Sequence, residues 1–125
     1  MWREGELESQ MSEIKDIIRK ITEFRDERDW MQFHDPKNMA ISIVIEAAEL
    51  MENFQWKTKE EVEKYVKEHR NDIEEEIADI AIYLFEFADN LGIDLTEAME
   101  RKLEKNAKKY PVDKVRGKHT KYDKL

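Results

Sequence analysis

The chain is predicted to be all-α, and three features of its 125 residues support this fold class. Charged residues make up 42% of the sequence and apolar residues 40%, a balance typical of helical proteins that are dense in Glu and Lys. Only three Gly and two Pro interrupt it. Apolar residues recur at helical spacing between helix caps. At this length we expect one domain with a four-helix-bundle-like fold and one additional short helix.

The first helix is predicted from about Glu6 to Arg28. Its apolar residues recur three and four positions apart, as on one face of a helix. They include Leu7, Met11, Ile14, Ile21 and Phe24. The connection that follows, residues 29–34, is rich in large rings.

A second helix is predicted from Asp35 to about Trp56. Asp35 is an N-cap and Pro36 occupies the first helical position, where its missing N–H costs nothing. The β-branched run 41–45 could also indicate a strand. The length of the segment, its cap and the absence of Gly favour a helix.

Two more helices are predicted in the middle of the chain. Thr58 and Glu61 form a capping box ahead of a short polar helix that ends near His69. Asn71 then caps a third long helix, which stops at Gly92.

The last helix is predicted to begin after Asp94 and to end before Pro111, because the residue before a proline is pushed out of the α region. Residues 112–125 are Lys-rich and weakly apolar, so we expect a mobile tail. The predicted domain therefore spans residues 1–111.

Two acidic pairs carry the strongest functional signal. Glu46 and Glu49 lie in a polar stripe that also holds Ser42 and Asn53 and is only about 60° wide at about 100° per residue. Glu76 and Asp79 repeat the pattern in a polar seam of the third long helix, formed by Asp72, Glu76, Asp79, Tyr83, Glu86 and Asn90.

A single Glu-x-x-Glu pair is usually a solvated helix face. Two such pairs on largely apolar helices are different, since buried carboxylates must be protonated, paired or bound to metal. We therefore predict that Glu46, Glu49, Glu76 and Asp79 bind a hard divalent cation, with Mg²⁺ as the first candidate.

Other classes of site find little support. A ferritin-like di-iron centre needs Glu-x-x-His on two helices, and none of the three histidines follows a Glu by three positions. The absence of Cys excludes disulfides and thiolate chemistry. A net charge of −8 disfavours a nucleic acid polymer as partner, and no apolar stretch reaches membrane length. A cytoplasmic protein is the expectation.

The second and third long helices are apolar over more than half of their circumference, which exceeds what a monomeric bundle needs. We expect a homo-oligomer, with a dimer as the minimum and a tetramer as an option. A non-enzymatic oligomerisation module with an acidic seam is one alternative function.

Large rings flank the predicted acidic cluster. Trp30 and His34 precede the first acidic helix, Trp56 lies at its end, and Tyr83 is one turn beyond Asp79. Such rings could belong to the core, but they are also what a nucleobase pocket uses for stacking.

Several segments together resemble the MazG-like nucleotide pyrophosphohydrolases, and among them the dCTP pyrophosphatase branch. They are RDWMQFHDPKN (28–38), EAAEL (46–50), FQWK (54–57), EIADI (76–80), IYL (82–84) and KNAKKYP (105–111). The resemblance covers roughly residues 12–111 in order, with compatible spacing.

This resemblance implies an all-α oligomer that splits a nucleoside triphosphate, dCTP or a related pyrimidine nucleotide, into monophosphate and pyrophosphate. A sibling activity on dUTP or damaged nucleotides is the alternative. Mg²⁺, or Mn²⁺ in its place, would bind the four acids. Substrate contacts would come from Trp30, Gln32, His34, Trp56 and Tyr83, with Asn106, Lys109 and Tyr110 near the phosphates or sugar.

The chain departs from the branch at Ile21, where a histidine that lines the base pocket is expected. The linker between the two acidic motifs is also slightly shorter. Both differences bear on base selectivity rather than on the chemistry.

Overall fold

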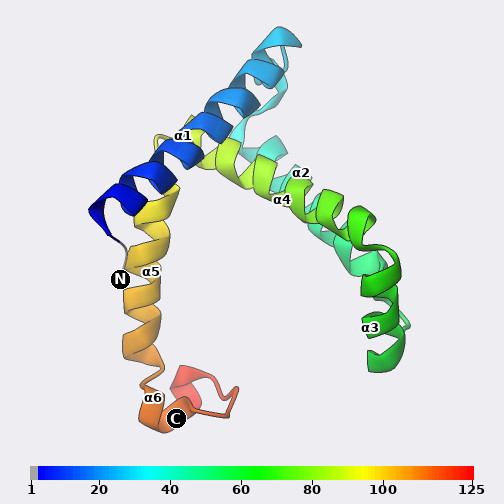
Figure 1. Cartoon of the computed structure of the whole chain (residues 1–125), viewed down its shortest axis with the longest axis vertical. Coiled ribbons are helices and arrows are strands. Elements are labelled where there is room, and N and C mark those ends of the chain that lie inside the picture. The colour runs from blue at the N-terminus through cyan, green and yellow to red at the C-terminus, as the bar shows by residue number, and fades with distance from the viewer. Residues whose placement is uncertain (1–2) are drawn as a thin grey trace. The chain divides into compact units, whose positions relative to one another are not determined.

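The computed structural model describes residues 3–125, apart from the side chains of residues 7–12, which include Leu7 and Met11. The described residues contain helices and no strand, so the all-α prediction is confirmed. The main helices are α1 (Glu4–Glu27), α2 (Pro36–Glu52), α3 (Lys59–Glu68), α4 (Arg70–Asn90) and α5 (Leu95–Lys109) (Figure 1). No helix among these residues is long and apolar enough to cross a membrane.

The described chain forms two compact units, which meet between Leu91 and Gly92 in sequence. The first unit, up to Leu91, is organised around α2 and α4, which run side by side in opposite directions (Figure 1). The first helix, α1, packs on the C-terminal part of α4, where Arg25 bonds Asn90. The short helix α3 connects the C-terminal end of α2 to the N-terminal end of α4. This arrangement brings the two acidic motifs opposite each other.

The predicted caps of α2, α3 and α5 are confirmed. The Asp35 carboxylate accepts the backbone N–H of Asn38 at 2.9 Å. Thr58 and Glu61 exchange both bonds of the capping box. Asp94 likewise accepts a backbone N–H three residues on, at 3.1 Å. These bonds satisfy donors that the first helical turn cannot pair internally.

The predicted cap of α4 is wrong. Asn71 lies inside the helix, and His69 occupies the cap position, where its side chain makes no capping bond to α4. Only this residue separates α3 from α4, and its ring stacks on that of Tyr65 with centroids 4.1 Å apart. The chain therefore re-enters helical geometry two residues earlier than the Asn signal suggests.

The second long helix is shorter than predicted. It ends at Glu52, and residues 53–56 form a turn. The Asn53 amide bonds the carbonyls of Glu49 and Leu50, while the Lys57 ammonium bonds the Asn53 carbonyl at 2.7 Å. These bonds replace the helical partners of the terminal carbonyls.

The second unit, Gly92–Leu125, holds α5, the four-residue α6 (Val112–Val115) and the 3₁₀ turn η2 (Tyr122–Lys124). Gly92 has φ of 69°, which explains a glycine at this point. The Lys109 ammonium lies 4.7 Å from the centroid of the Tyr122 ring, which also meets Tyr110 edge-on. The mobility of residues 112–125 stays a prediction.

Few apolar residues of the described part are buried: Ile21, Met39 and Ile73, of which Met39 alone is fully buried. Many others on α2 and α4 are exposed, with Val44 at 67% and Ile77 at 52%. A single chain therefore leaves much of its apolar helix surface in water.

Candidate active site

Three carboxylates converge between α2 and α4. One oxygen from each of Glu46, Glu49 and Glu76 lies within 4.8 Å of the other two. The (i, i+3) spacing places Glu46 and Glu49 on one face of α2, and the antiparallel pairing brings Glu76 to that face. Oxygen donors in such a group suit a hard cation such as Mg²⁺.

The cluster contains two orphaned oxygens. Oε2 of Glu46 and Oε2 of Glu76 are buried, and neither has a hydrogen-bond partner among the described residues. A buried polar atom without a partner is costly, and in a native protein it calls for an explanation. A cation bound by these oxygens supplies one.

Electrostatics in the cluster favour added positive charge. Burial raises the pKa of Glu46, and the neighbouring carboxyl group of Glu49 raises it further. Burial also raises the pKa of Glu76, followed by the charges of Glu49 and Asp79. Asp79 therefore acts on the cluster through its charge, although its oxygens are outside the group of three.

Tyr83 lies one turn beyond Asp79 on α4. Burial raises the pKa of its hydroxyl, and the charges of Glu46, Asp79 and Glu86 add to this effect. The side chain thus lies between the carboxylate cluster and a second buried acid farther along the helix.

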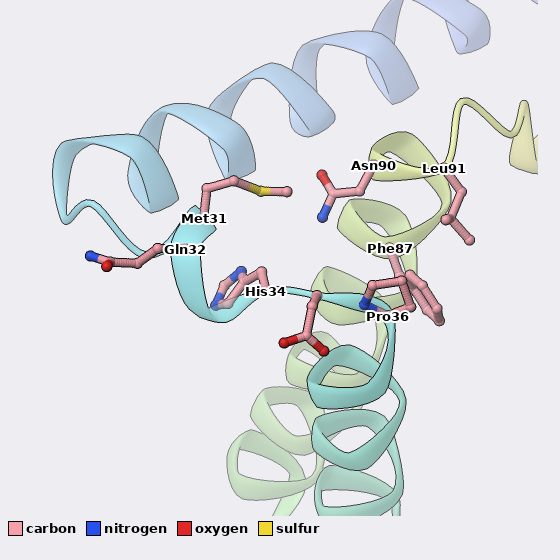
Figure 2. A pocket seen from close by; sticks show the side chains of 8 residues that line it. Met31, Gln32, His34, Pro36, Phe87, Asn90 and Leu91 are labelled. Carbon is pink, nitrogen blue, oxygen red and sulfur yellow. The ribbon is translucent and has the colours of Figure 1, made fainter.

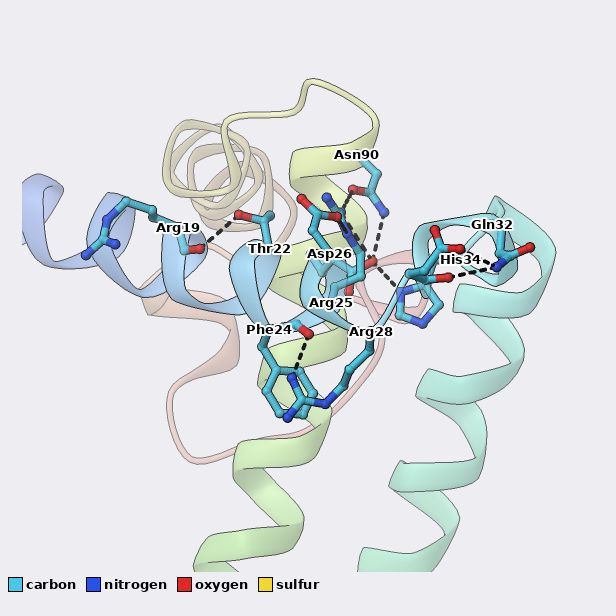
Figure 3. A network of polar contacts seen from close by, with 11 residues as sticks. Arg19, Thr22, Phe24, Arg25, Asp26, Arg28, Gln32, His34 and Asn90 are labelled. Atoms are coloured by element: carbon cyan, nitrogen blue, oxygen red, sulfur yellow. Dashed lines mark hydrogen bonds and ion pairs between the residues drawn. The ribbon is translucent and has the colours of Figure 1, made fainter.

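That second acid is Glu86, the most buried charged residue described, at 3% exposure. Its Oε2 lies 2.7 Å from Nδ1 of His34 and accepts a bond from the Asn90 amide at 3.0 Å. Arg25 lies 3.8 Å from the same oxygen and donates to Oδ1 of Asn90 at 2.9 Å (Figure 3). We name these four residues the Glu86 network.

The sequence placed Glu86 in the polar seam but predicted no functional role for it. Its position within Leu84–Ala88, an otherwise apolar stretch, could have indicated that its carboxylate is buried. Its partners Arg25 and His34 lie 61 and 52 residues away in sequence, so the network itself was not visible.

A pocket of about 220 Å³ adjoins this network. His34 and Asn90 contribute to both (Figure 2). The full lining is Met31, Gln32, His34, Asp35, Pro36, Phe87, Asn90 and Leu91. The predicted base-contacting residues His34 and Gln32 are thus in one pocket, with the Gln32 amide bonded to the Asp29 carbonyl at 2.9 Å.

The two predicted stacking indoles lie elsewhere. Trp30 meets Phe24 edge-on, with centroids 5.8 Å apart, and is partly exposed. Trp56 is 92% exposed and adopts φ of 67°, a left-handed conformation that is strained for a bulky residue. It follows α2, whereas His34 precedes this 17-residue helix, which at 1.5 Å per residue is about 25 Å long. Trp56 therefore lies apart from His34 within one chain, whereas the rings of His34 and Tyr83 meet edge-on with centroids 6.5 Å apart.

The remaining predicted substrate contacts, Asn106, Lys109 and Tyr110, belong to the second unit. Asn106 and Lys109 are on α5, and Tyr110 caps its end. Their roles stay predictions.

Comparison with known proteins identifies a family and several relatives that are similar to this chain. The MazG-like family model matches residues 41–125. The chain is 41% identical to bovine (Bos taurus) dCTP pyrophosphatase 1 over 114 residues, which cover 90% of this chain and 68% of the relative. The human protein of that name is 39% identical over 114 residues, covering 90% of this chain and 67% of the relative.

A solved structure agrees with these relatives. The crystal structure of a pyrophosphatase from Archaeoglobus fulgidus superposes with a TM-score of 0.73 at 48% sequence identity. The superposition covers 82% of this chain and 93% of that one. Together with the family match and the helical pair that carries the acidic cluster, this shows that the chain belongs to the MazG-like family.

Proposed function

We propose that the protein is a nucleoside triphosphate pyrophosphohydrolase that splits dCTP, or a related pyrimidine nucleotide, into the monophosphate and pyrophosphate. The observation that carries this proposal is the convergence of Glu46, Glu49 and Glu76, with two buried oxygens that have no hydrogen-bond partner in the described part of the chain. The relatives named dCTP pyrophosphatase 1 support the choice of substrate.

The residues present fit a divalent cation. Their donors are all carboxylate oxygens, which Mg²⁺ prefers, and Mn²⁺ accepts the same ligands. Glu46, Glu49 and Glu76 would hold the cation, with Asp79 completing the set. When bound, it supplies the positive charge that polarises a phosphate oxygen and makes a water molecule more acidic.

The chain's own residues then have separate tasks. The four carboxylates would bind the cation, whose positive charge would hold the triphosphate close to them. Glu46 or Glu49 accepts the proton of the attacking water, a task for which a raised carboxyl pKa, as in Glu46, is favourable. His34 and Gln32 bind the edge of the base in the pocket described above. Lys109 is the candidate for stabilising the departing pyrophosphate.

We further propose that the working form is a homo-oligomer. The exposed apolar residues of α2 and α4 include Ile41, Val44, Ile45, Met51 and Ile77. An exposed apolar surface of this kind is typical of an interface. In such an assembly the exposed Trp56 of one copy could stack on a base bound near His34 of another, which would restore the four-ring pocket.

A panel of nucleoside triphosphates with pyrophosphate detection tests the proposed activity. We expect the highest kcat/KM for dCTP. A higher value for dUTP or for an oxidised nucleotide would assign the protein to the sibling activity instead. A non-enzymatic oligomerisation module would show no turnover and no thermal stabilisation by Mg²⁺ with a non-hydrolysable nucleotide.

A further inference from the structure

The donors and acceptors of the Glu86 network can be assigned by starting from Arg25. The guanidinium of Arg25 can only donate, so the Asn90 atom that it contacts at 2.9 Å is the amide oxygen. The Asn90 amide nitrogen therefore faces Glu86 and donates to Oε2 at 3.0 Å. The orientation of Asn90 is fixed by these bonds.

Oε2 of Glu86 thus accepts the Asn90 amide hydrogen. Arg25, 3.8 Å away, places positive charge beside this buried carboxylate, and the same guanidinium also bonds Asp26 at 2.8 Å. Nδ1 of His34, 2.7 Å from that Glu86 oxygen, must then carry a hydrogen and donate it. In the neutral ring this leaves Nε2 as a lone-pair acceptor.

His34 also lines the pocket of about 220 Å³. This volume lies below the roughly 300–1,000 Å³ of pockets that enclose whole drug-sized ligands, so it suits a single ring. With Nδ1 bonded to Glu86, Nε2 is the ring nitrogen that a ligand can use. Among the described residues no side chain bonds to it.

We infer that Glu86 is a positioning residue that fixes His34 as a hydrogen-bond acceptor and thereby selects bases with an exocyclic amino group. This inference rests on the proposed function. Cytosine presents an N–H donor at the position where uracil and thymine present a carbonyl oxygen. An acceptor at Nε2 can bond the N–H donor of cytosine. It repels the carbonyl oxygen of uracil or thymine, because two facing acceptors have no hydrogen between them.

The tautomer can be measured without any variant or substrate. Long-range ¹H–¹⁵N spectra of the ¹⁵N-labelled protein report which imidazole nitrogen carries hydrogen, and the chain has only three histidines to assign. We expect the neutral His34 ring to carry its hydrogen at Nδ1 and not at Nε2. A ring protonated at Nε2, or at both nitrogens, overturns the inference.

Selectivity gives the second readout. Glu86→Ala removes the acceptor, which frees His34 to carry its hydrogen at Nε2. We expect the ratio of kcat/KM for dCTP to that for dUTP to fall roughly tenfold or more, the scale of one well-placed base-edge contact. Asp89→Ala, an exposed acid one turn away, is the matched control and should leave the ratio unchanged.

Glu86→Gln separates positioning from folding. Arg25 and Asn90 would orient the new amide with its oxygen toward them, so an acceptor for Nδ1 is kept. This variant should retain the Nδ1–H tautomer and most of the dCTP preference. Equal scaling of both substrates in Glu86→Ala, or equal loss of preference in both variants, contradicts the inference while leaving the proposed activity intact. Wild-type protein that hydrolyses no nucleotide overturns the proposed function and this inference with it.

Discussion

Glu76 keeps a buried carboxylate oxygen without a hydrogen-bond donor among the described residues, and burial followed by neighbouring acids raises its pKa. We predict that Glu76→Gln abolishes turnover, since the amide keeps the shape but removes the charge that holds Mg²⁺. The loss of kcat should exceed the roughly 10- to 100-fold cost of losing an outer-shell partner of a metal ligand. Steady-state kinetics measure it, with the exposed Glu75→Gln as the control. Activity within a few-fold of wild type would disprove the assignment of Glu76 as a ligand.

The same substitution should raise the melting temperature of the metal-free protein. Removing an unpaired buried charge relieves a cost that only metal binding offsets. Calorimetry with a chelator present measures the change. A lower melting temperature, with activity lost, would instead indicate a structural role for the Glu76 carboxylate.

The raised carboxyl pKa values also fix the sign of the pH dependence. In the folded chain Glu46 and Glu76 hold protons that the unfolded chain releases near its ordinary pKa of 4.5. The free energy of unfolding of the metal-free protein should therefore fall as the pH rises from about 4.5 through the raised values.

At the proposed site Mg²⁺ would take the place of those protons, so it should raise the melting temperature more at about pH 8 than at about pH 5. Thermal unfolding at the two pH values, with and without Mg²⁺, tests this expectation. An equal effect at both would show that the cation binds away from these carboxylates.

Trp56 combines near-complete exposure with a strained backbone, which suits a residue held for a ligand. We predict that Trp56→Ala lowers kcat/KM by roughly 10- to 100-fold for every nucleotide that the protein accepts, because stacking tolerates any base. Trp56→Phe, which keeps a stacking ring, should recover most of the loss. Unchanged kinetics in the alanine variant would remove Trp56 from the site.

Among the helix boundaries, those set by bonds between residues close in sequence could be predicted. The caps at Asp35, Thr58 and Asp94 were predictable because each bond spans three residues. The start of α4 was not, because the nearly continuous passage from α3 through His69 outweighs the Asn71 signal.

The apolar surface of α2 gives the prediction at the scale of helices. Val44→Arg places a charge on the exposed apolar face and should convert the proposed oligomer to monomers, with a lower melting temperature. Analytical ultracentrifugation measures the assembly. Asn71→Arg adds the same charge at an exposed position and should leave the assembly intact. A Val44→Arg protein that sediments as wild type would place the interface elsewhere.

For the whole molecule, helical spacing was enough to predict the fold class and the pairing of two acidic helices. The meeting of Glu46, Glu49 and Glu76 followed from that pairing. The Glu86 network did not, since its partners come from three separate parts of the chain. The separation of Trp56 from His34 also depends on chain direction along α2, which the residue pattern alone does not reveal.

The products formed from dCTP test the central claim, metal-assisted cleavage to monophosphate and pyrophosphate, most directly. We would incubate the wild-type protein with dCTP and Mg²⁺ and follow the phosphorus species by ³¹P NMR, with Glu76→Gln as the inactive reference. The predicted result is equal amounts of dCMP and pyrophosphate, formed only when Mg²⁺ or Mn²⁺ is present. Formation of dCDP and phosphate, or turnover that persists in a chelator, would contradict it.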